Sequence, residues 1–211
     1  WLGIDPQSIR HILITHQDTD HVGAVEADSP GLFRNATLYV GETENRYLTG
    51  EVRRKVIYHL YKLPQVTIPN EKVLLRDRQV FELDSIQVEC FLVPGHTWGH
   101  MVYLIDGKYL FTGDTLWFGA DGGYSFISAL AEDNRLAVRS LAALEAKLME
   151  RGLKPIFLTA IPAGRTILTL RLPIRTSCAL PLKNASMTPM PPTTLTTSRT
   201  TPRKRPAAVF C

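Results

Sequence analysis

Short apolar runs separated by polar loops fill the first three quarters of the chain. Two of them, at 11–15 and 37–40, predict buried strands. From residue 72 the pattern becomes β-rich, with strands expected at 72–75, 79–83, 86–93, 101–105 and 108–112, and a last one at 155–159. Asp106-Gly107, which separates two of these runs, is typical of a tight hairpin turn.

Three other stretches have helical features. Asp5 followed by Pro6 predicts an N-cap and the first turn of a short helix that continues to residue 10. The stretch 42–63 is helix-like, and its charged cluster is interpreted as a solvated face: Glu51, Arg53, Arg54 and Lys55. Apolar residues recur at helical spacing over 134–151 and end at Gly152. Strands punctuated by helices, without regular βαβ repetition, predict a layered α/β sandwich.

Composition places the chain among single globular domains. Of its 211 residues, 45% are hydrophobic and 21% are charged, and no apolar run is long enough to cross a membrane. We therefore expect no membrane partner. The three cysteines, Cys90, Cys178 and Cys211, are far apart and form neither a disulfide framework nor a thiolate metal site. A reducing, cytoplasmic setting is the expectation.

The net charge of +4 is the sum over two parts of the chain that differ in charge. Residues 1–160 carry 16 Lys and Arg against 20 Asp and Glu, whereas residues 161–211 carry eight basic residues and no acidic one. The second part also contains eight prolines and ten threonines. We expect a domain over 1–160 followed by a basic Pro/Thr-rich, disordered tail over 161–211, which makes the acidic domain a poor candidate for nucleic-acid binding.

Residues that can bind metal follow three of the predicted strands. His16, Asp18, Asp20 and His21 lie in the loop after the first strand, His96 lies in Pro94–His100, and Asp114 lies in Thr112–Thr115. Each loop alone could be a polar turn, with its aspartates capping helices. Because all three loops place imidazole or carboxylate just past a strand end, we expect them to converge on one metal site.

At these loops the chain resembles the metallo-β-lactamase superfamily, whose signature is His-x-His-x-Asp-His, then a Gly-His loop, a Gly-Asp and a late histidine. The resemblance covers residues 5–160 and implies an αββα sandwich. It also implies that His16 and His96 bind a first metal ion, that Asp20 and His21 bind a second, and that Asp114 bridges both. His100 matches a histidine that is usually structural in this family.

Asp18 departs from the signature, which has histidine at this position. A carboxylate makes the first site harder and more anionic, which moves preference from Zn²⁺ toward Fe²⁺ or Mn²⁺. Zn²⁺ is still favoured where it is available. We interpret Asp18 as a metal ligand, with a role in orienting the true ligands as the alternative.

The activity implied by the resemblance is hydrolysis of a small ester, lactone or thioester by water activated between two divalent metal ions. Asp20 and Asp114 are the expected catalytic residues, the first orienting the attacking water and the second bridging the ions. The alternative is a catalytically dead or weakly metal-binding fragment. Nuclease action is a third hypothesis, disfavoured because the acidic domain offers no surface for phosphates. The oligomeric state is left open.

Both ends of the chain depart from the family pattern. The late histidine is expected near residue 160, but Ile161 follows and no histidine occurs beyond His100. A disordered interaction tail, a basic nucleic-acid arm and an out-of-frame translation can each explain 161–211. We favour the last, because a one-base shift after Ala160 can encode His-Thr-Gly-Arg-Thr-Asp-Asp-Phe. The family places its first strands well before the ligand loop, which begins here at residue 16, so we expect an incomplete sandwich of low stability.

Overall fold

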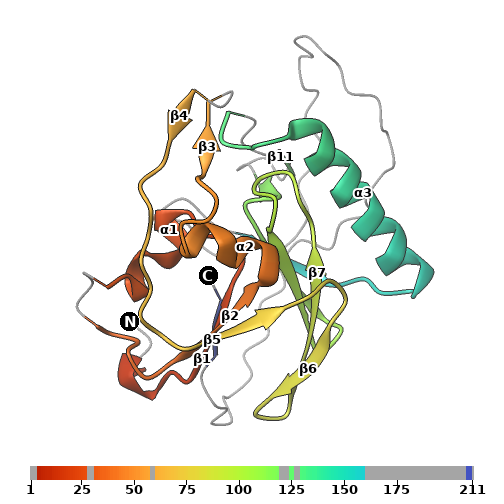
Figure 1. Ribbon diagram of the computed structural model, residues 1–211. Helices are drawn as coiled ribbons and strands as arrows, with labels where there is room; N and C mark the ends of the chain where they lie inside the picture. Colours follow the sequence, from red (N-terminus) through yellow and green to blue (C-terminus); the bar gives the residue numbers. More distant parts are fainter. Residues whose placement is uncertain are drawn as a thin grey trace.

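The computed structural model describes residues 4–27, 31–57, 60–118, 124–125, 129–159 and 208–210. Two β-sheets face each other and helices cover their outer faces, which gives an αββα sandwich (Figure 1). The predicted fold is confirmed. The helices are 3-10 helix η1 (Pro6–Ser8), α1 (Thr19–Val22), 3-10 helix η2 (Gly23–Val25), α2 (Glu42–Leu48) and α3 (Asn134–Glu150).

The first sheet is parallel, with the strand order β13-β1-β2-β5. Its strands are β1 (His11–Ile14), β2 (Thr37–Gly41), β5 (Lys72–Leu75) and β13 (Ala208–Phe210). β1 and β2 are aligned so that His11 lies opposite Thr37. A sheet covered on both faces requires nearly continuous apolar strands, and β1 is buried over its last three residues. The sequence predicted β1 and β2 for this reason.

The second sheet is an antiparallel meander of β6 (Val80–Leu83), β7 (Ile86–Leu92), β8 (Met101–Ile105) and β9 (Tyr109–Gly113), to which β12 (Ile156–Thr159) adds in parallel beside β9. The predicted turn at Asp106-Gly107 is confirmed, since both residues have positive φ, 49° and 61°. Aspartate and glycine adopt this conformation at low cost, and it matches the twist of the two strands.

Strand alternation divides the apolar residues between the layers. Leu13 of β1 faces the second sheet, in a cluster with Val88, Cys90 and Tyr103, whereas Ile12 and Ile14 belong to a cluster on the outer face. The Tyr103 hydroxyl also donates to the Ile14 carbonyl oxygen, 2.6 Å away in the first sheet. The two sheets are therefore joined by apolar packing and by a buried hydrogen bond.

The α3 helix covers the outer face of the second sheet. Leu144 and Leu148 pack against Phe91, Leu110 and other strand residues on this face. The helix begins after Asp133, whose side chain accepts a hydrogen bond from the Leu136 amide, and it ends two residues before Gly152. Its spacing and its first residue agree with the sequence prediction, and its last residue lies one position earlier than predicted.

The helix expected over 42–63 is wrong beyond its first seven residues. α2 ends at Leu48, and Gly50 then takes a positive φ of 78°. The chain continues into a hairpin of β3 (Lys55–Val56) and β4 (Tyr61–Lys62), which Figure 1 shows projecting from the sandwich. β-Branched Val52 and Val56 favour extended backbone over helix, whereas Ile57 takes a positive φ of 51° in the turn after β3, so tertiary contacts decide the outcome.

The short helix after Asp5 begins as predicted, with the Asp5 side chain accepting from the Gln7 amide, but it ends at Ser8. A further two-stranded ribbon is formed by β10 (Trp117–Phe118) and β11 (Tyr124–Ser125). Of the predicted tail, 161–207 and residue 211 lie outside the described residues, and the three residues of β13 pair with β1. The division into a domain and a tail stays a prediction.

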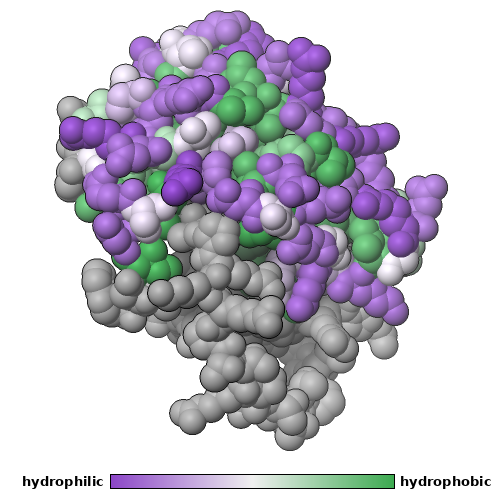
Figure 2. Space-filling model, turned by 90° about the horizontal axis from the view of Figure 1, so that it is seen from below, coloured by the Kyte–Doolittle hydropathy of each residue, from purple (hydrophilic) through white to green (hydrophobic). Residues whose placement is uncertain are grey.

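Viewed from below, the described surface is mostly hydrophilic, with hydrophobic residues scattered among the charged ones (Figure 2). Among the helices that the structure describes, none has the length and apolar character needed to span a bilayer.

Candidate metal centre

Three loops bring the predicted ligands together at the carboxyl ends of their strands. His16 and His21 belong to the loop and short helix after β1, His96 lies between β7 and β8, and Asp114 follows β9. The ring centroid of His16 is 4.1 Å from that of His21 and 4.6 Å from that of His96. The three loops therefore meet at one place, as the sequence predicted.

The donor atoms form two groups that share one carboxylate. His16, His96 and Asp114 make the first group, and Asp20, His21 and Asp114 make the second. Within each group, the donor atoms all lie within 4.8 Å of one another. The shared residue is buried, whereas the Asp20 side chain is 73% exposed and lies at the solvent side. Two imidazole nitrogens with carboxylates are a donor set for Zn²⁺ or Fe²⁺.

Unsatisfied buried atoms show that these residues fit a divalent ion. His16 Nε2 makes no hydrogen bond of good geometry in the described part of the chain, although Asp18 Oδ2 lies 3.5 Å away. The other ring nitrogen, Nδ1, contacts Thr15 Oγ1 at 3.1 Å. Asp114 Oδ1 also lacks a hydrogen bond of good geometry, although His21 Nε2 lies 3.1 Å away. Buried polar atoms without a partner are costly, and a cation would satisfy both.

Protonation states also favour metal binding. Burial, with help from the neighbouring His21, lowers the pKa of His16 to about 3, so its imidazole is neutral near pH 7. Burial would raise the pKa of Asp114, but the close contact with His21 and the charges of the nearby histidines hold it below its usual value. Neutral imidazole and ionised carboxylate are the forms that bind metal.

His21 and Asp114 also influence each other. Burial would lower the pKa of His21, but the Asp114 carboxylate raises it above its ordinary value. A proton on His21 therefore competes with a cation in the second group, and metal binding there releases that proton.

Asp18 lies beside the first group but is also held by a buried arginine. Its Oδ2 is 3.2 Å from His96 Nε2 and 3.5 Å from His16 Nε2. Arg54 donates from Nε to Oδ1 at 3.0 Å and from Nη2 to Oδ2 at 3.2 Å. Burial would raise the pKa of Asp18, but the adjacent His16 and His96 imidazoles and the hydrogen bonds from Arg54 hold it far below its usual range.

The interpretation of Arg54 as part of a solvated face is wrong. Glu51, Arg53 and Lys55 are exposed as expected, but Arg54 is only 2% exposed. Sequence reasoning missed this residue, because its neighbours are all charged and only the fold turns its side chain inward. The replacement of histidine by Asp18 was an available signal, since a buried carboxylate calls for a cation.

Glu44 is a second residue that the sequence did not indicate. It is fully buried on α2, and its carboxylate accepts from the Gln17 amide and from the Thr97 hydroxyl. Burial raises its pKa to about 8. Glu44 therefore ties the loop of His16 to the loop of His96.

The loop of His96 is also fastened on its other side. The Glu132 amide donates to the His96 carbonyl oxygen, and the Glu132 carboxylate accepts from the Tyr47 hydroxyl and the Trp98 amide. These contacts fix the backbone on both sides of the imidazole.

His100 has the structural position that the resemblance implied. It is fully buried, its ring is stacked at 4.9 Å on that of His16, and it belongs to neither donor group. A Cβ on Gly113 would lie only 2.8 Å from His100 Nε2, so the Gly-Asp loop packs closely on this ring.

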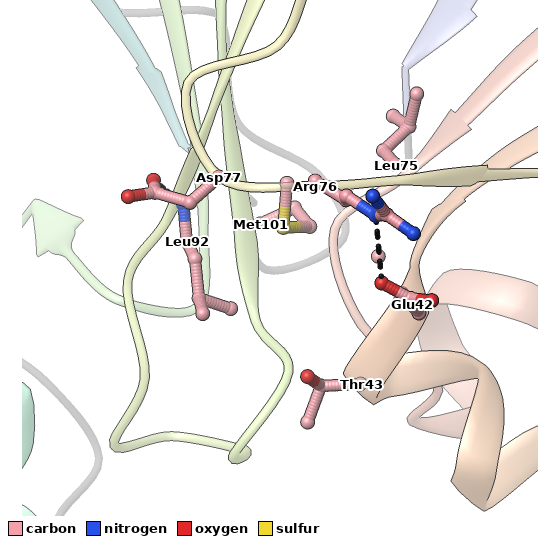
Figure 3. A pocket seen from close by; sticks show the side chains of 8 residues that line it. Glu42, Thr43, Leu75, Arg76, Asp77, Leu92 and Met101 are labelled. Carbon is pink, nitrogen blue, oxygen red and sulfur yellow. Dashed lines mark hydrogen bonds and ion pairs between the residues drawn. The ribbon is translucent and has the colours of Figure 1, made fainter.

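A separate hollow of about 160 Å³ lies between the end of β5 and the start of α2 (Figure 3). Leu75, Met101 and Leu92 form its apolar part, and Arg76 pairs with Glu42 at its mouth across 3.2 Å. None of its lining residues belongs to the donor groups. The hollow is therefore not the metal site.

Comparison with known proteins decides the family. A family model described as the metallo-beta-lactamase superfamily matches residues 1–149. The chain belongs to this superfamily. Hydroxyacylglutathione hydrolase from Pseudomonas paraeruginosa is 33% identical over 149 residues, which cover 69% of this chain and 48% of that protein. The chain thus spans about half the length of the curated relatives that it matches.

Solved structures of the superfamily share the fold. A probable metal-dependent hydrolase from Staphylococcus aureus superposes with a TM-score of 0.55 and 20% identity, covering 74% of this chain and 56% of that one. A B3 metallo-beta-lactamase with an active-site glutamic acid gives a TM-score of 0.52 and 21% identity, covering 80% and 64%. At this identity the superpositions describe the superfamily fold alone. The late histidine position, near residue 160, lies outside the described residues.

Proposed function

We propose that this chain is a metal-dependent hydrolase that cleaves a small ester, lactone or thioester at a site for two divalent metal ions. The observation that carries the proposal is the sharing of the buried Asp114 by two donor groups. His16 and His96 would hold the first ion, Asp20 and His21 the second, and Asp114 both. Two divalent ions held by these residues would supply Lewis acidity toward water and toward the scissile carbonyl.

The protein residues divide the remaining work. The exposed Asp20 carboxylate can orient the attacking water and accept its proton, since it lies at the solvent side of the site. His16 and His96 are buried and line the inner side of the site, away from solvent. Zn²⁺ is the proposed metal because it is favoured by this mixture of nitrogen and oxygen donors, with Fe²⁺ or Mn²⁺ as alternatives.

A thioester is the proposed substrate class among the three. The support is the name hydroxyacylglutathione hydrolase, which eight of the related proteins carry. The partner is thus a small molecule rather than nucleic acid or membrane. A cytoplasmic setting is also part of the proposal, consistent with the free, buried Cys90.

The test compares metal content and hydrolysis. The chain, loaded with Zn²⁺, Fe²⁺ or Mn²⁺ in turn, is assayed on a hydroxyacyl-glutathione thioester, a simple aryl ester and a lactone, before and after treatment with a chelator. We expect metal-dependent cleavage with the thioester preferred, and its loss in D114A. Hydrolysis that survives chelation would refute the proposal. Metal content well below one ion per chain would favour the weakly binding alternative.

A further inference from the structure

The Asp18–Arg54 pair lies next to the first donor group and is closed off from solvent. Arg54 presents Nε and Nη2 to the two carboxylate oxygens in a bidentate fork, the strongest arrangement for such a pair. Nη2 is also 3.4 Å from His96 Nε2 and donates to the Leu130 carbonyl oxygen. With only 2% of its surface exposed, Arg54 cannot contact a substrate, so any role in the reaction acts through Asp18.

The pair leaves Asp18 able to bind metal. A carboxylate oxygen has two lone pairs, and Oδ2 accepts one hydrogen bond from Arg54. The same Oδ2 also forms a hydrogen bond with His96 Nε2 at 3.2 Å and lies 3.5 Å from His16 Nε2, and an ion bound to both imidazoles would replace these two contacts. Oδ1 is occupied by Arg54 and by the Gln17 side-chain amide, at 2.7 Å. Asp18 is thus restricted to one available oxygen, and that oxygen is next to both imidazoles.

The charges of the pair cancel. The superfamily signature has a neutral histidine where this chain has Asp18, and a lone buried carboxylate there would be costly. The Arg54 guanidinium compensates the charge of Asp18, and the Glu132 carboxylate lies on its far side, with Oε1 3.8 Å from Nη1. The Glu132 carboxylate accepts hydrogen bonds from the Tyr47 hydroxyl and from the backbone amides of Lys55 and Trp98. At 3.0 Å, Asp18 is a closer ionic partner of Arg54 than Glu132 is at 3.8 Å.

We propose that Arg54 is the positioning residue of the first metal position: it compensates the charge of Asp18 and directs Oδ2 to the ion, so that the two residues together replace one histidine. This inference rests on the proposed metal site but not on the proposed substrate. It reverses the expectation of a more anionic first site, and it implies that Asp18 and Arg54 depend on each other.

A double-mutant cycle tests this dependence. Wild type, D18H, R54M and D18H/R54M are prepared metal-free, and Zn²⁺ stoichiometry and affinity are measured by competition with a chromophoric chelator. D18H leaves a buried guanidinium beside the ion, and R54M leaves an uncompensated carboxylate. We expect each single variant to bind one of the two ions about 10- to 100-fold more weakly. D18H/R54M, which has an imidazole in place of the charged Asp18–Arg54 pair, should recover most of the wild-type affinity.

Thermal unfolding of the same four metal-free proteins provides a second readout that does not require the metal. We expect D18H and R54M each to unfold at a lower temperature than wild type, and the double variant to unfold above both. R46M is the matched control, because Arg46 lies on α2 and its guanidinium forms a solvent-exposed ion pair with Glu51. It should leave affinity and unfolding temperature unchanged.

The outcomes separate this inference from the proposed function. If wild type binds two ions and R54M binds them equally well, or if D18H/R54M binds as weakly as the product of the single effects, the role of Arg54 is refuted while the metal site stands. If wild type binds no metal, both proposals fail. The inference is supported if Zn²⁺ affinity falls in both single variants and recovers in D18H/R54M.

Discussion

The Glu44 carboxylate accepts a hydrogen bond from the Thr97 hydroxyl across 2.6 Å, and both residues are fully buried. Its other oxygen accepts from the Gln17 amide at 2.8 Å. Gln17 follows His16 and Thr97 follows His96, so one side chain sets the separation of two loops that carry metal ligands. The geometry of the site therefore depends on a residue of α2 that touches no ligand donor atom.

Replacing Glu44 with alanine should destabilise the chain and weaken its metal binding. The Gln17 amide and the Thr97 hydroxyl would lose their acceptor in a buried setting, which costs about 1–3 kcal/mol of unfolding free energy. Urea denaturation checks the stability, and chelator competition checks Zn²⁺ affinity. E42A is the control, since Glu42 is exposed on the same helix. Equal stability of E44A and E42A would contradict the bridging role.

The raised pKa of Glu44, about 8, predicts a pH dependence of stability. Between the ordinary glutamate pKa of 4.5 and about 8, the native state holds a proton that the unfolded state has lost. The contribution is therefore complete below pH 4.5 and disappears as pH rises through 8. Unfolding of metal-free wild type should show this decline, and E44Q, which does not titrate, should show less of it. Parallel pH profiles would argue against the assignment.

Ligand substitutions should separate the two donor groups. H96A removes a donor from the first group and H21A removes one from the second, so each should retain about one tightly bound ion per chain. D114A removes the shared carboxylate and should weaken both ions. Metal analysis after dialysis measures the content. H11A serves as the control, because His11 contacts Tyr39 and Asp84 outside the site. Two retained ions in D114A would contradict the shared role of Asp114.

A methyl group on Gly99 should disrupt the same part of the site. A Cβ there would lie 2.1 Å from the Glu44 backbone nitrogen, which no real contact allows, so α2 and the His96 loop would have to separate. We expect G99A to lose about 1–3 kcal/mol of stability through this overpacking. G23A is the comparison, since Gly23 has helical φ and nothing within 4 Å of the added atom. Thermal unfolding of the two variants side by side decides the point.

The local pattern of apolar and polar residues was sufficient to predict most strands and the long helix of the sandwich. β5 and β8 have the predicted bounds, and α3 differs from its prediction by one residue, because a strand or helix with one consistently apolar face is specified by its own residues. The hairpin at Asp106-Gly107 follows from the backbone preferences of two adjacent residues. The helix prediction for 42–63 was wrong after residue 48 because the apolar pattern there is mixed. Packing against the rest of the fold therefore determines that a hairpin forms instead of a helix.

The candidate ligands were visible in the sequence because each follows a strand end, a position that a short window reveals. His16, His96 and Asp114 converge as that rule predicts. The roles of Arg54 and Glu44 could not be predicted from the sequence, because they depend on contacts with distant residues. Their partners, Asp18 and Thr97, are 36 and 53 residues away in the chain, and a charged side chain in a charged or helical stretch looks the same whether it faces water or the core.

The sequence by itself thus determined most strands of the two large sheets, the hairpin at Asp106-Gly107, the long helix and the residues that can bind metal, since these depend on neighbours along the chain. Only the tertiary structure decided that Asp114 joins two donor groups, that Glu44 spans two loops and that Arg54 is buried against Asp18. The physical reason is burial: excluding water makes an unpaired charge costly, and which charges become buried together is a property of the assembled layers.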